Sequence, residues 1–404
     1  MQKFTCRICS GKTYQSLFQW RIPLPADMKE RPEGCIKYPI EPVICENCGH
    51  VQLKETLSVN MYDEYLYTPS FSTEFQEYIN TFANKLNEAY RGKSKKVVEI
   101  GSSNGFLLKK MQKNGWDVLG FEPSSVLAEA AERTGVRTEQ MYFGSEESIR
   151  FIETLPSPDL IVARHVMEHL DSLNHIVSLI GEWLDDGIFV MEVPWLLKII
   201  KEKQFYAFFH EHVSYFSIAS IQTLLNRYGL RLIDIEENSL EGGSVVIYAT
   251  KDNQRKCERN QINAYLEQEK MFCSNEAVKE FSLEVSKQIH KIRELVKEKK
   301  RCGKKLAAWG AGQRGVSLLN LCGLTAEDID FVIDKNENYW WKYIPGDAGI
   351  QVVPPDWLRE HFVDFILILA TGYADEIVNE NEEFVKRGGS FINMIDTVKE
   401  ERGD

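Results

Sequence analysis

A repeated alternation of short apolar segments with helical stretches, starting near residue 95, constrains the fold more than any other feature. The apolar segments are KKVVEIG, VLGFEP, DLIVARH and GIFVMEVP, and each of them leads into a loop. Strands buried on both faces have this composition, and intervening helices let neighbouring strands run parallel. The pattern therefore predicts an α/β domain on a largely parallel sheet.

The rest of the chain divides around this domain. Residues 230–250 read as two strands joined through Gly242 and Gly243, which predicts an antiparallel finish to the sheet. A charged helical segment follows, and a second α/β pattern runs from KKLAAWGAG to SFINMID. We expect four parts, namely an N-terminal module, the first α/β domain, a connecting helical segment and a second α/β domain, at residues 1–58, 59–252, 253–301 and 302–404.

Bulk properties exclude several classes of protein. The net charge of −12 argues against a nucleic-acid partner, which would require a basic face. The longest apolar stretches, such as DFILILA, are far shorter than a membrane helix, and the N-terminus carries no apolar signal region. We therefore expect a cytoplasmic protein with no membrane partner, whose nine cysteines are metal ligands or free thiols rather than disulfides.

Two Cys-x-x-Cys pairs predict a metal site. Cys6 and Cys9 form one pair, and Cys45 and Cys48 form the other. Two such knuckles can complete a closed tetrahedral Zn²⁺ site, which leaves no position for water and is therefore structural. Cys35 and His50 are alternative ligands, and four unrelated thiols remain the other interpretation.

The segment VVEIGSSNG predicts a ligand-binding turn between a strand and a helix that begins near Phe106. Glycines allow a ligand close to the backbone, and Glu122, at the end of the next strand, can accept both hydroxyls of a ribose. Glu99 would repel a pyrophosphate, and the spacing is G-x-x-x-G, so we expect S-adenosylmethionine rather than a dinucleotide. The residues assigned to this cofactor are Glu99, Gly101, Ser102, Asn104, Gly105, Glu122, Pro123 and His165.

Histidines gather in two short motifs that follow strands. ARHVMEHL contains His165, Glu168 and His169, and FFHEHVSYFS contains His210, Glu211 and His212. Reactive groups of open α/β sheets lie beyond the carboxyl ends of the strands, and histidine titrates near neutrality. One of these histidines is therefore a candidate base, although His165 and Glu168 could also serve only to hold the loop together. A zinc site made from these histidines is disfavoured because methyl transfer needs no metal.

Taken together, the motifs resemble those of the sugar C-methyltransferases of deoxysugar biosynthesis over nearly the whole chain. The matching segments are the two cysteine knuckles, VVEIGSSNGFLL, ARHVMEH, EVPWLL, HEHVSYFS, LEGGS, WGAGQRG, Pro345-Gly346 and ATGYADEI. The resemblance implies a class I methyltransferase sheet of the Rossmann-like type, flanked by an N-terminal zinc module and a C-terminal Rossmann-like α/β domain. It also implies a nucleotide-linked 4-keto-6-deoxysugar as the small-molecule acceptor, methylated at carbon through an enolate.

The resemblance also assigns roles to particular residues. His212 and His169 become candidate bases, Glu211 their assisting carboxylate, and His210 and Tyr67 further catalytic candidates. The residues expected to contact the acceptor are Tyr215, Gly243, Ser244, Arg314 and Asp334.

This chain departs from the family pattern where the acceptor should bind. Phe209 replaces a tyrosine whose phenol is a candidate acid or base, and Thr371-Gly372 replaces a Trp-Asn pair. A family His-Gly-Gly-Ser-Leu-Arg segment reads Glu241-Gly-Gly-Ser-Val-Val, whereas Arg314 keeps a basic residue in the glycine turn. A changed acceptor, methylated at oxygen, nitrogen or another carbon, is therefore a second hypothesis.

Two further hypotheses belong to other classes. Gly310, Gly312, Gly315 and Asp334 form a G-x-G-x-x-G pattern with a following acidic residue, which fits an NAD(P)-dependent oxidoreductase. The other is a binding module without activity, which the intact donor motif and the clustered histidines disfavour.

Overall fold

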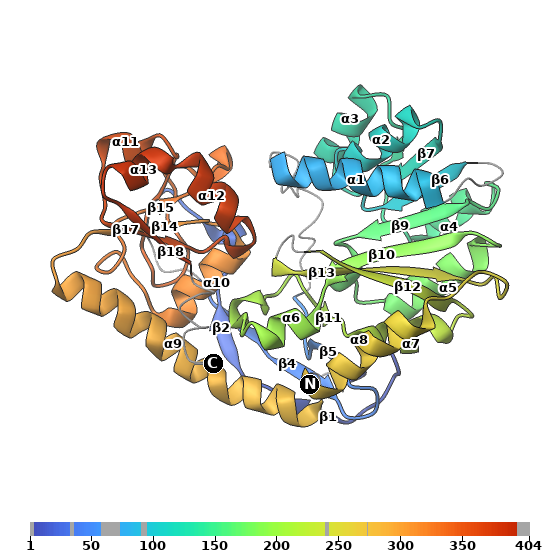
Figure 1. The fold of residues 1–404 in the computed structure, drawn as a ribbon, viewed down its shortest axis with the longest axis horizontal. Helices are drawn as coiled ribbons and strands as arrows, with labels where there is room; N and C mark the ends of the chain where they lie inside the picture. The colour runs from blue at the N-terminus through green and yellow to red at the C-terminus, as the bar shows by residue number, and fades with distance from the viewer. Residues whose placement is uncertain are drawn as a thin grey trace.

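The computed structural model describes residues 4–32, 36–57, 73–89, 95–238, 242–272 and 274–393. Figure 1 shows the second α/β domain on the left, the first α/β domain on the right, and N-terminal strands low between them. Among the described residues, no helix combines the length and apolarity needed to cross a membrane.

The first α/β domain contains a seven-stranded sheet in the order β12-β13-β10-β9-β6-β7-β8. Its strands are β6 (Lys96–Ile100), β7 (Asp117–Phe121), β8 (Thr138–Glu139), β9 (Leu160–Arg164), β10 (Ile188–Pro194), β12 (Arg231–Asn238) and β13 (Ser244–Thr250). Strand β13 runs antiparallel to both β10 and β12, and the remaining pairs are parallel. The predicted antiparallel finish is confirmed. The strand order reverses at β6, which opens a crevice at the carboxyl ends of β6 and β9.

The described part of this domain contains seven α-helices, most of which bury an apolar stripe against the sheet. They are α1 (Thr73–Ala89), α2 (Phe106–Lys113), α3 (Ser125–Arg133), α4 (Glu146–Ile152), α5 (Leu173–Trp183), α6 (Leu196–Lys201) and α7 (Ile218–Asn226). Leu196, Ile199 and Ile200 of α6 instead belong to the core shared with the N-terminal module and α10 (Gln313–Cys322). In α5, Leu173, Ile176 and Ile180 recur at helical spacing and are buried. Helix α7 begins at a capping box between Ser217 and Ser220.

The second α/β domain has a five-stranded parallel sheet in the order β16-β15-β14-β17-β18. Its strands are β14 (Leu306–Trp309), β15 (Val332–Ile333), β16 (Val352–Val353), β17 (Phe365–Ile368) and β18 (Ser390–Asn393), and its helices are α10 (Gln313–Cys322), α11 (Trp357–Glu360), α12 (Ala374–Glu380) and α13 (Glu382–Lys386), with the 3-10 turns η6 (Glu337–Tyr339) and η7 (Thr371–Tyr373). A Cβ atom on Gly315 would lie 2.1 Å from the carbonyl oxygen of Gly310, so only glycine lets α10 pack this close to the turn. The Rossmann-like prediction is confirmed.

The N-terminal module shares a sheet with the first α/β domain. Strands β1 (Tyr14–Ser16), β4 (Pro42–Cys45) and β5 (Val51–Leu53) form a sheet whose fourth strand is β11 (Ser214–Tyr215). Ser214 and Tyr215 pair with Gln52 and Val51. Strands β2 (Trp20–Ile22) and β3 (Tyr38–Ile40) form a separate hairpin, and η1 (Pro25–Asp27) lies between them in the sequence. The module therefore supports the segment that follows the His-Glu-His motif.

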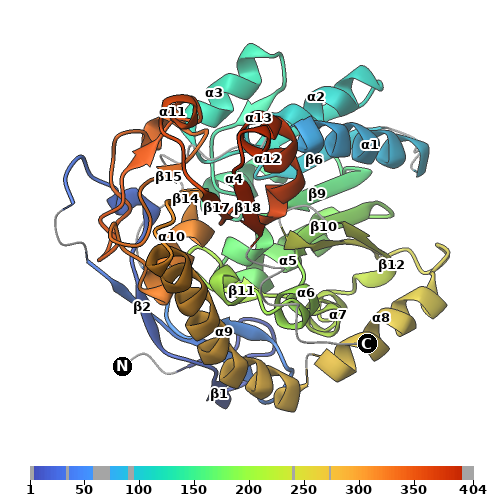
Figure 2. The same ribbon diagram turned by 60° about the vertical axis from the view of Figure 1, so that its left-hand side comes forward.

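Helices α8 (Arg259–Phe272) and α9 (Asn275–Arg301) connect the two α/β domains. Both views show α9 as a long rod beside the second α/β domain (Figures 1 and 2). Its buried residues Val278, Phe281 and Ile292 belong to one hydrophobic core with residues of the N-terminal module, the segment 205–209 and α10. This continuous core joins the parts that surround the crevice. The domain boundaries at 58, 252 and 301 stay predictions.

Candidate active site

The turn after β6 brings the backbone close to the loop that follows β9. Gly101 and Gly105 have φ values of 68° and 73°, in the left-handed region that favours glycine. A Cβ atom on Gly101 would lie 2.2 Å from the Cγ2 atom of Val166. The turn is therefore closed tightly against the β9 loop, and α2 begins at Phe106 as predicted.

Two carboxylates lie at the ends of the first two strands of this crevice. Glu99 is buried, and its Oε2 atom has no hydrogen-bond partner among the described residues. Burial raises the pKa of Glu99 to about 8, although Arg164 opposes this shift. Glu122 accepts hydrogen bonds from the backbone amides of Ser103 (2.8 Å) and Ser124 (2.9 Å). Burial also raises the pKa of Glu122, and these amides oppose the shift.

Unsatisfied polar atoms fit a polar ligand at this turn. Buried polar atoms without partners are rare in folded proteins, and within the described part of the chain Glu99 Oε2, Ser102 Oγ and Ser103 Oγ are three of them. Asn104 and Pro123 lie half-buried beside them. These residues suit the amino-acid and ribose parts of S-adenosylmethionine.

The contact predicted between Ser102 and the cofactor stays a prediction. A Cβ atom on Gly120 would lie 2.3 Å from the Ser102 hydroxyl, so this side chain packs on β7 rather than facing the crevice. Its amide donates to Phe121 and its carbonyl accepts from Gly105. Ser102 therefore holds the turn in place through its backbone, and its buried hydroxyl has no hydrogen-bond partner among the described residues.

A buried ion pair at the ends of β9 and β10 escaped the sequence reasoning. Arg164 Nε donates to Glu192 Oε2 at 2.6 Å, and both side chains are almost completely buried. The other oxygen of Glu192 accepts from Tyr78 (2.9 Å) and Asn238 (2.7 Å). The rings of Phe75, Tyr78 and Phe82 surround the guanidinium at 5.4 to 5.6 Å. The sequence signal was a charged residue at the end of each of two apolar strands.

His165 lies between two carboxylates and has a φ of 50°. Its Nδ1 atom is 3.4 Å from Glu168 Oε1, and its Nε2 atom is 3.5 Å from Glu192 Oε1. The contact predicted between His165 and S-adenosylmethionine stays a prediction. The side chain also links the ion pair to the turn η3 (Met167–His169).

The two histidine motifs meet at His169 and His212. Their rings are 4.9 Å apart in an edge-to-face arrangement. His169 Nδ1 lies 2.8 Å from the backbone oxygen of Glu211. Because a carbonyl can only accept, Nδ1 carries the hydrogen and Nε2 keeps a lone pair. Burial lowers the pKa of His212 well below its ordinary value, and the positive charge of Arg314 lowers it further. His212 is therefore neutral near pH 7.

Two other predicted residues of this loop point elsewhere. His210 Nε2 lies 3.2 Å from the backbone oxygen of Pro39, and its ring contacts Tyr38 of the N-terminal module. The hydroxyl of Tyr215 accepts from the Phe209 amide (3.1 Å) and donates to the Phe209 carbonyl (3.3 Å). Both are buried and fix the loop, and the catalytic role of His210 and the acceptor contact of Tyr215 stay predictions.

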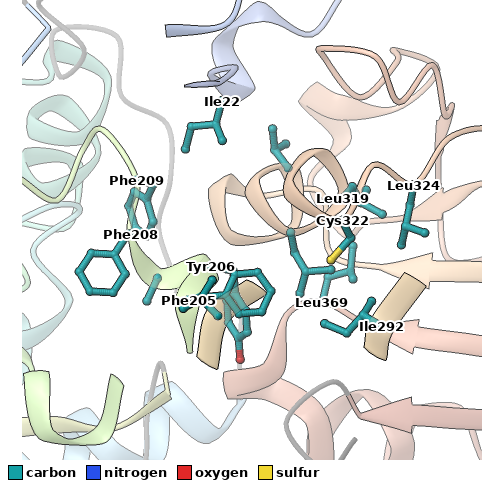
Figure 3. Close-up of a cluster of buried hydrophobic side chains, with 14 of the residues drawn as sticks. Ile22, Phe205, Tyr206, Phe208, Phe209, Ile292, Leu319, Cys322, Leu324 and Leu369 are labelled. Carbon is teal, nitrogen blue, oxygen red and sulfur yellow. The ribbon is translucent and has the colours of Figure 1, made fainter. Parts of the chain in front are cut away.

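The second α/β domain approaches this loop through α10. Figure 3 shows Phe205 and Tyr206, with Phe208 and Phe209 further out, on the side of the cluster opposite Leu319 and Cys322. The Tyr206 hydroxyl lies 3.2 Å from Thr371 Oγ1 in η7. Arg314 Nη1 would be 3.2 Å from a Cβ atom on Gly242, so this arginine reaches the Gly-Gly-Ser turn. Arg314 thus lies between the domains, near His212.

The other residues predicted to contact the acceptor differ in their surroundings. Ser244 is fully buried, and its hydroxyl has no hydrogen-bond partner among the described residues. Gly243 packs on Lys198, where a Cβ atom would come within 2.9 Å of the side chain. Asp334 accepts from the amides of Ala311 (2.6 Å) and Asn336 (2.7 Å) and so braces the glycine turn. Tyr67 and the alternative zinc ligand Cys35 lie outside the described residues.

The four predicted zinc ligands come together. The sulfur atoms of Cys6, Cys9, Cys45 and Cys48 all lie within 4.8 Å of one another. Cys6 and Cys48 are 3.6 Å apart, as are Cys9 and Cys45. A hydrogen bond from Cys48 lowers the pKa of Cys6 to about 5, which favours a thiolate. His50 instead lies 3.3 Å from Ser214 Oγ, so it is not part of this group.

Known methyltransferases are similar to this protein over most of the chain. Residues 72–235 match the family described as a methyltransferase domain, and residues 239–395 match the C-methyltransferase C-terminal domain. The chain is 28% identical over 399 residues to C-methyltransferase NovU of Streptomyces niveus, covering 96% of this chain and 95% of that protein. These matches are to methyltransferases, so the oxidoreductase and inactive-module hypotheses are not carried forward.

Solved methyltransferase structures are similar to part of the chain. Magnesium protoporphyrin IX methyltransferase of Synechocystis PCC 6803 with bound SAM is 12% identical, with a TM-score of 0.35, over 44% of this chain and 80% of that one. A SAM-dependent methyltransferase of Archaeoglobus fulgidus is 15% identical, with a TM-score of 0.36, over 44% of this chain and 94% of that one.

Proposed function

We propose that this protein is an S-adenosylmethionine-dependent C-methyltransferase that methylates a carbon of a nucleotide-linked keto-deoxysugar through an enolate. The observation that carries the proposal is the His169–His212 pair, 4.9 Å between ring centres. The pair belongs to the loops that follow β9 and α6. Through Val166, the β9 loop packs on the turn after β6, where the methyl donor is proposed to bind. A carbon acid adjacent to a ketone needs such a base before it can act as a nucleophile.

The donor assignment rests on the turn after β6. Glu99, Asn104, Gly105, Glu122 and Pro123 would hold S-adenosylmethionine together with the backbone of Gly101. When bound there, this cofactor supplies an activated methyl group on a sulfonium. The protein therefore has to create and position the carbon nucleophile rather than activate the methyl group.

The histidine pair supplies the base. In the proposed step, the lone pair of His212 or His169 takes the proton from the carbon beside the ketone. The electron pair of the broken C–H bond stays on the acceptor as an enolate, and the imidazole becomes an imidazolium. The imidazolium returns its proton to solvent after the product leaves. Glu211 assists through its backbone oxygen, which orients His169.

The acceptor's nucleotide part is assigned to the second α/β domain. Arg314 follows the glycine turn of the second α/β domain and reaches Gly242 of the first. Its positive charge would neutralise a phosphate group of the acceptor bound between the domains. The Gly243-Ser244 turn and Asp334 complete the proposed acceptor site. The four cysteines are proposed to bind one structural Zn²⁺, because four sulfur ligands leave no position for a substrate.

Phe209 favours a second candidate within the same class. Its ring lies 4.2 Å from that of His212, where the family tyrosine would place a phenol. Without that phenol the acceptor chemistry can differ, so O-, N- or C-methylation of another acceptor is the alternative.

The proposal is tested with purified protein, methyl-labelled S-adenosylmethionine, and dTDP-4-keto-6-deoxyglucose with related keto-sugars. Wild type should label one of the sugars at carbon. H212A should lower turnover about 100-fold or more while calorimetry shows unchanged donor affinity. H290A, which changes an exposed histidine of α9, is the matched control. Labelling of no keto-sugar would contradict the acceptor class, and an active H212A would remove His212 as the base.

A further inference from the structure

Glu168 is a buried carboxylate whose role the reaction above leaves unexplained. It lies in η3, next to His169, and is 1% exposed. Neither of its carboxylate oxygens has a hydrogen-bond partner among the described residues. Its backbone oxygen accepts from the Val213 amide at 2.8 Å, which ties it to the loop of His212. A buried carboxylate without hydrogen bonds is costly, so a protein keeps one only where a positive charge compensates it.

The groups around this carboxylate are imidazoles. One oxygen of Glu168, one nitrogen of His169 and one nitrogen of His212 all lie within 4.8 Å of one another. His165 Nδ1 approaches Glu168 at 3.4 Å from the same motif. Glu168 therefore faces three side chains that become cationic only when they take up a proton.

Other charged and titratable groups also face His212. The positive charge of Arg314 on α10, and any positive charge on His169 or His165, disfavours the protonated form of His212. The ring centre of Tyr215 lies 6.4 Å from that of His212, and its hydroxyl accepts a hydrogen bond from the backbone amide of Phe209. Glu211 is the neighbouring carboxyl of the loop, near His169. In this setting an imidazolium on His212 needs a nearby negative charge.

We propose that Glu168 is a positioning residue whose carboxylate provides the counter-charge for the imidazolium formed when the His169–His212 pair accepts the acceptor's proton. This inference rests on the proposed function and deepens it. The proton moves from the acceptor carbon to a histidine nitrogen, and Glu168 itself neither gains nor loses one. The carboxylate thus makes a buried histidine basic enough to act beside Arg314.

The first test needs no acceptor. In protein with ¹⁵N-labelled histidines, magnetic resonance follows the titration of each imidazole, and H169N and H212N variants assign the two signals. The pKa of His169 or His212 should be lower in E168Q than in wild type by about one unit, because an opposing charge has been removed. E269Q, which alters another buried glutamate whose partners are Trp195 and the Ile218 amide rather than a histidine, should leave these titrations unchanged. Identical titrations in E168Q and wild type, or a change confined to His165, would overturn the proposal.

The second test uses turnover. E168Q should lower kcat about 100-fold with little change in KM or in donor affinity, and the acid limb of its pH–rate profile should move to lower pH. E168D keeps the charge and should recover part of kcat, which a purely structural defect would not predict. A stoichiometric divalent metal that is present in wild type and lost in E168Q would overturn the proposal in favour of a metal ligand. If wild type methylates no sugar, the proposed acceptor fails while the titration still decides the role of Glu168.

Discussion

At the scale of single residues, Glu99 shows how burial couples donor binding to pH. Burial raises its pKa to about 8 from an ordinary value of 4.5. The folded protein therefore holds an extra proton between these pH values. The stability that this proton contributes is complete below about 4.5 and is lost as pH rises through about 8. A cationic donor favours the carboxylate, so binding below pH 8 must expel the proton.

We predict that the affinity for S-adenosylmethionine rises with pH up to about 8, by roughly tenfold per unit at most. E99Q should bind more weakly at pH 8 and lose most of this dependence. Calorimetry in buffers of different ionisation enthalpy measures the proton release directly. E139Q, which alters a partly exposed carboxylate of an Arg137 pair, is the control. A pH dependence that is the same in E99Q and wild type would contradict the assignment.

At the scale of elements, helix α1 is fastened to the sheet by the Arg164–Glu192 pair. Tyr78 and the rings of Phe75 and Phe82 come from α1, whereas Arg164 ends β9 and Glu192 lies beside it within β10. Removing one partner of a buried ion pair leaves the other charge uncompensated, which typically costs about 3–5 kcal/mol. The effect of losing Arg164 should therefore far exceed that of losing a surface cation.

We predict that R164A lowers the free energy of unfolding by about 3–5 kcal/mol, measured by urea titration. R137A breaks an exposed pair with Glu139 and should cost less than about 1 kcal/mol. If R164A and R137A lowered the free energy of unfolding equally, the buried pair would contribute no more to stability than the exposed pair.

The elements differ in how far the sequence could predict them. Periodicity predicted the strands of both α/β sheets except the two-residue strand β8, and it predicted the antiparallel finish, because each pattern is local. The turn at Gly101 was predictable for the same reason. The pairing of β5 with β11 and the meeting of His169 with His212 join segments far apart in the chain, and no local pattern encodes them. The roles of His210 and Tyr215 stay predictions, because spacing indicates the loop but not the direction in which a side chain points.

At the scale of the whole molecule, the N-terminal module supports the catalytic loop rather than standing apart. Its strand β5 pairs with β11, directly after His212, and the carbonyl of Pro39 meets His210. Cys45 ends β4, and Cys48 lies in the turn between β4 and β5. The proposed zinc site therefore fixes the strand against which the loop is built, while the donor turn belongs to another sheet.

Removal of zinc should therefore lower turnover while leaving the binding of S-adenosylmethionine almost unchanged. We predict about one zinc per chain, and a C45S/C48S variant without zinc should have a lower Tm and a kcat reduced at least tenfold, since small errors of position are costly in catalysis. Donor affinity should stay near that of wild type because Glu99 and Glu122 keep their sheet. C302S, which alters an exposed cysteine, should retain both zinc and activity. Metal analysis, calorimetry and turnover are compared on the same preparations. A zinc-free variant with full turnover would show that β11 needs no such support, and equal losses of donor binding and turnover would indicate general unfolding.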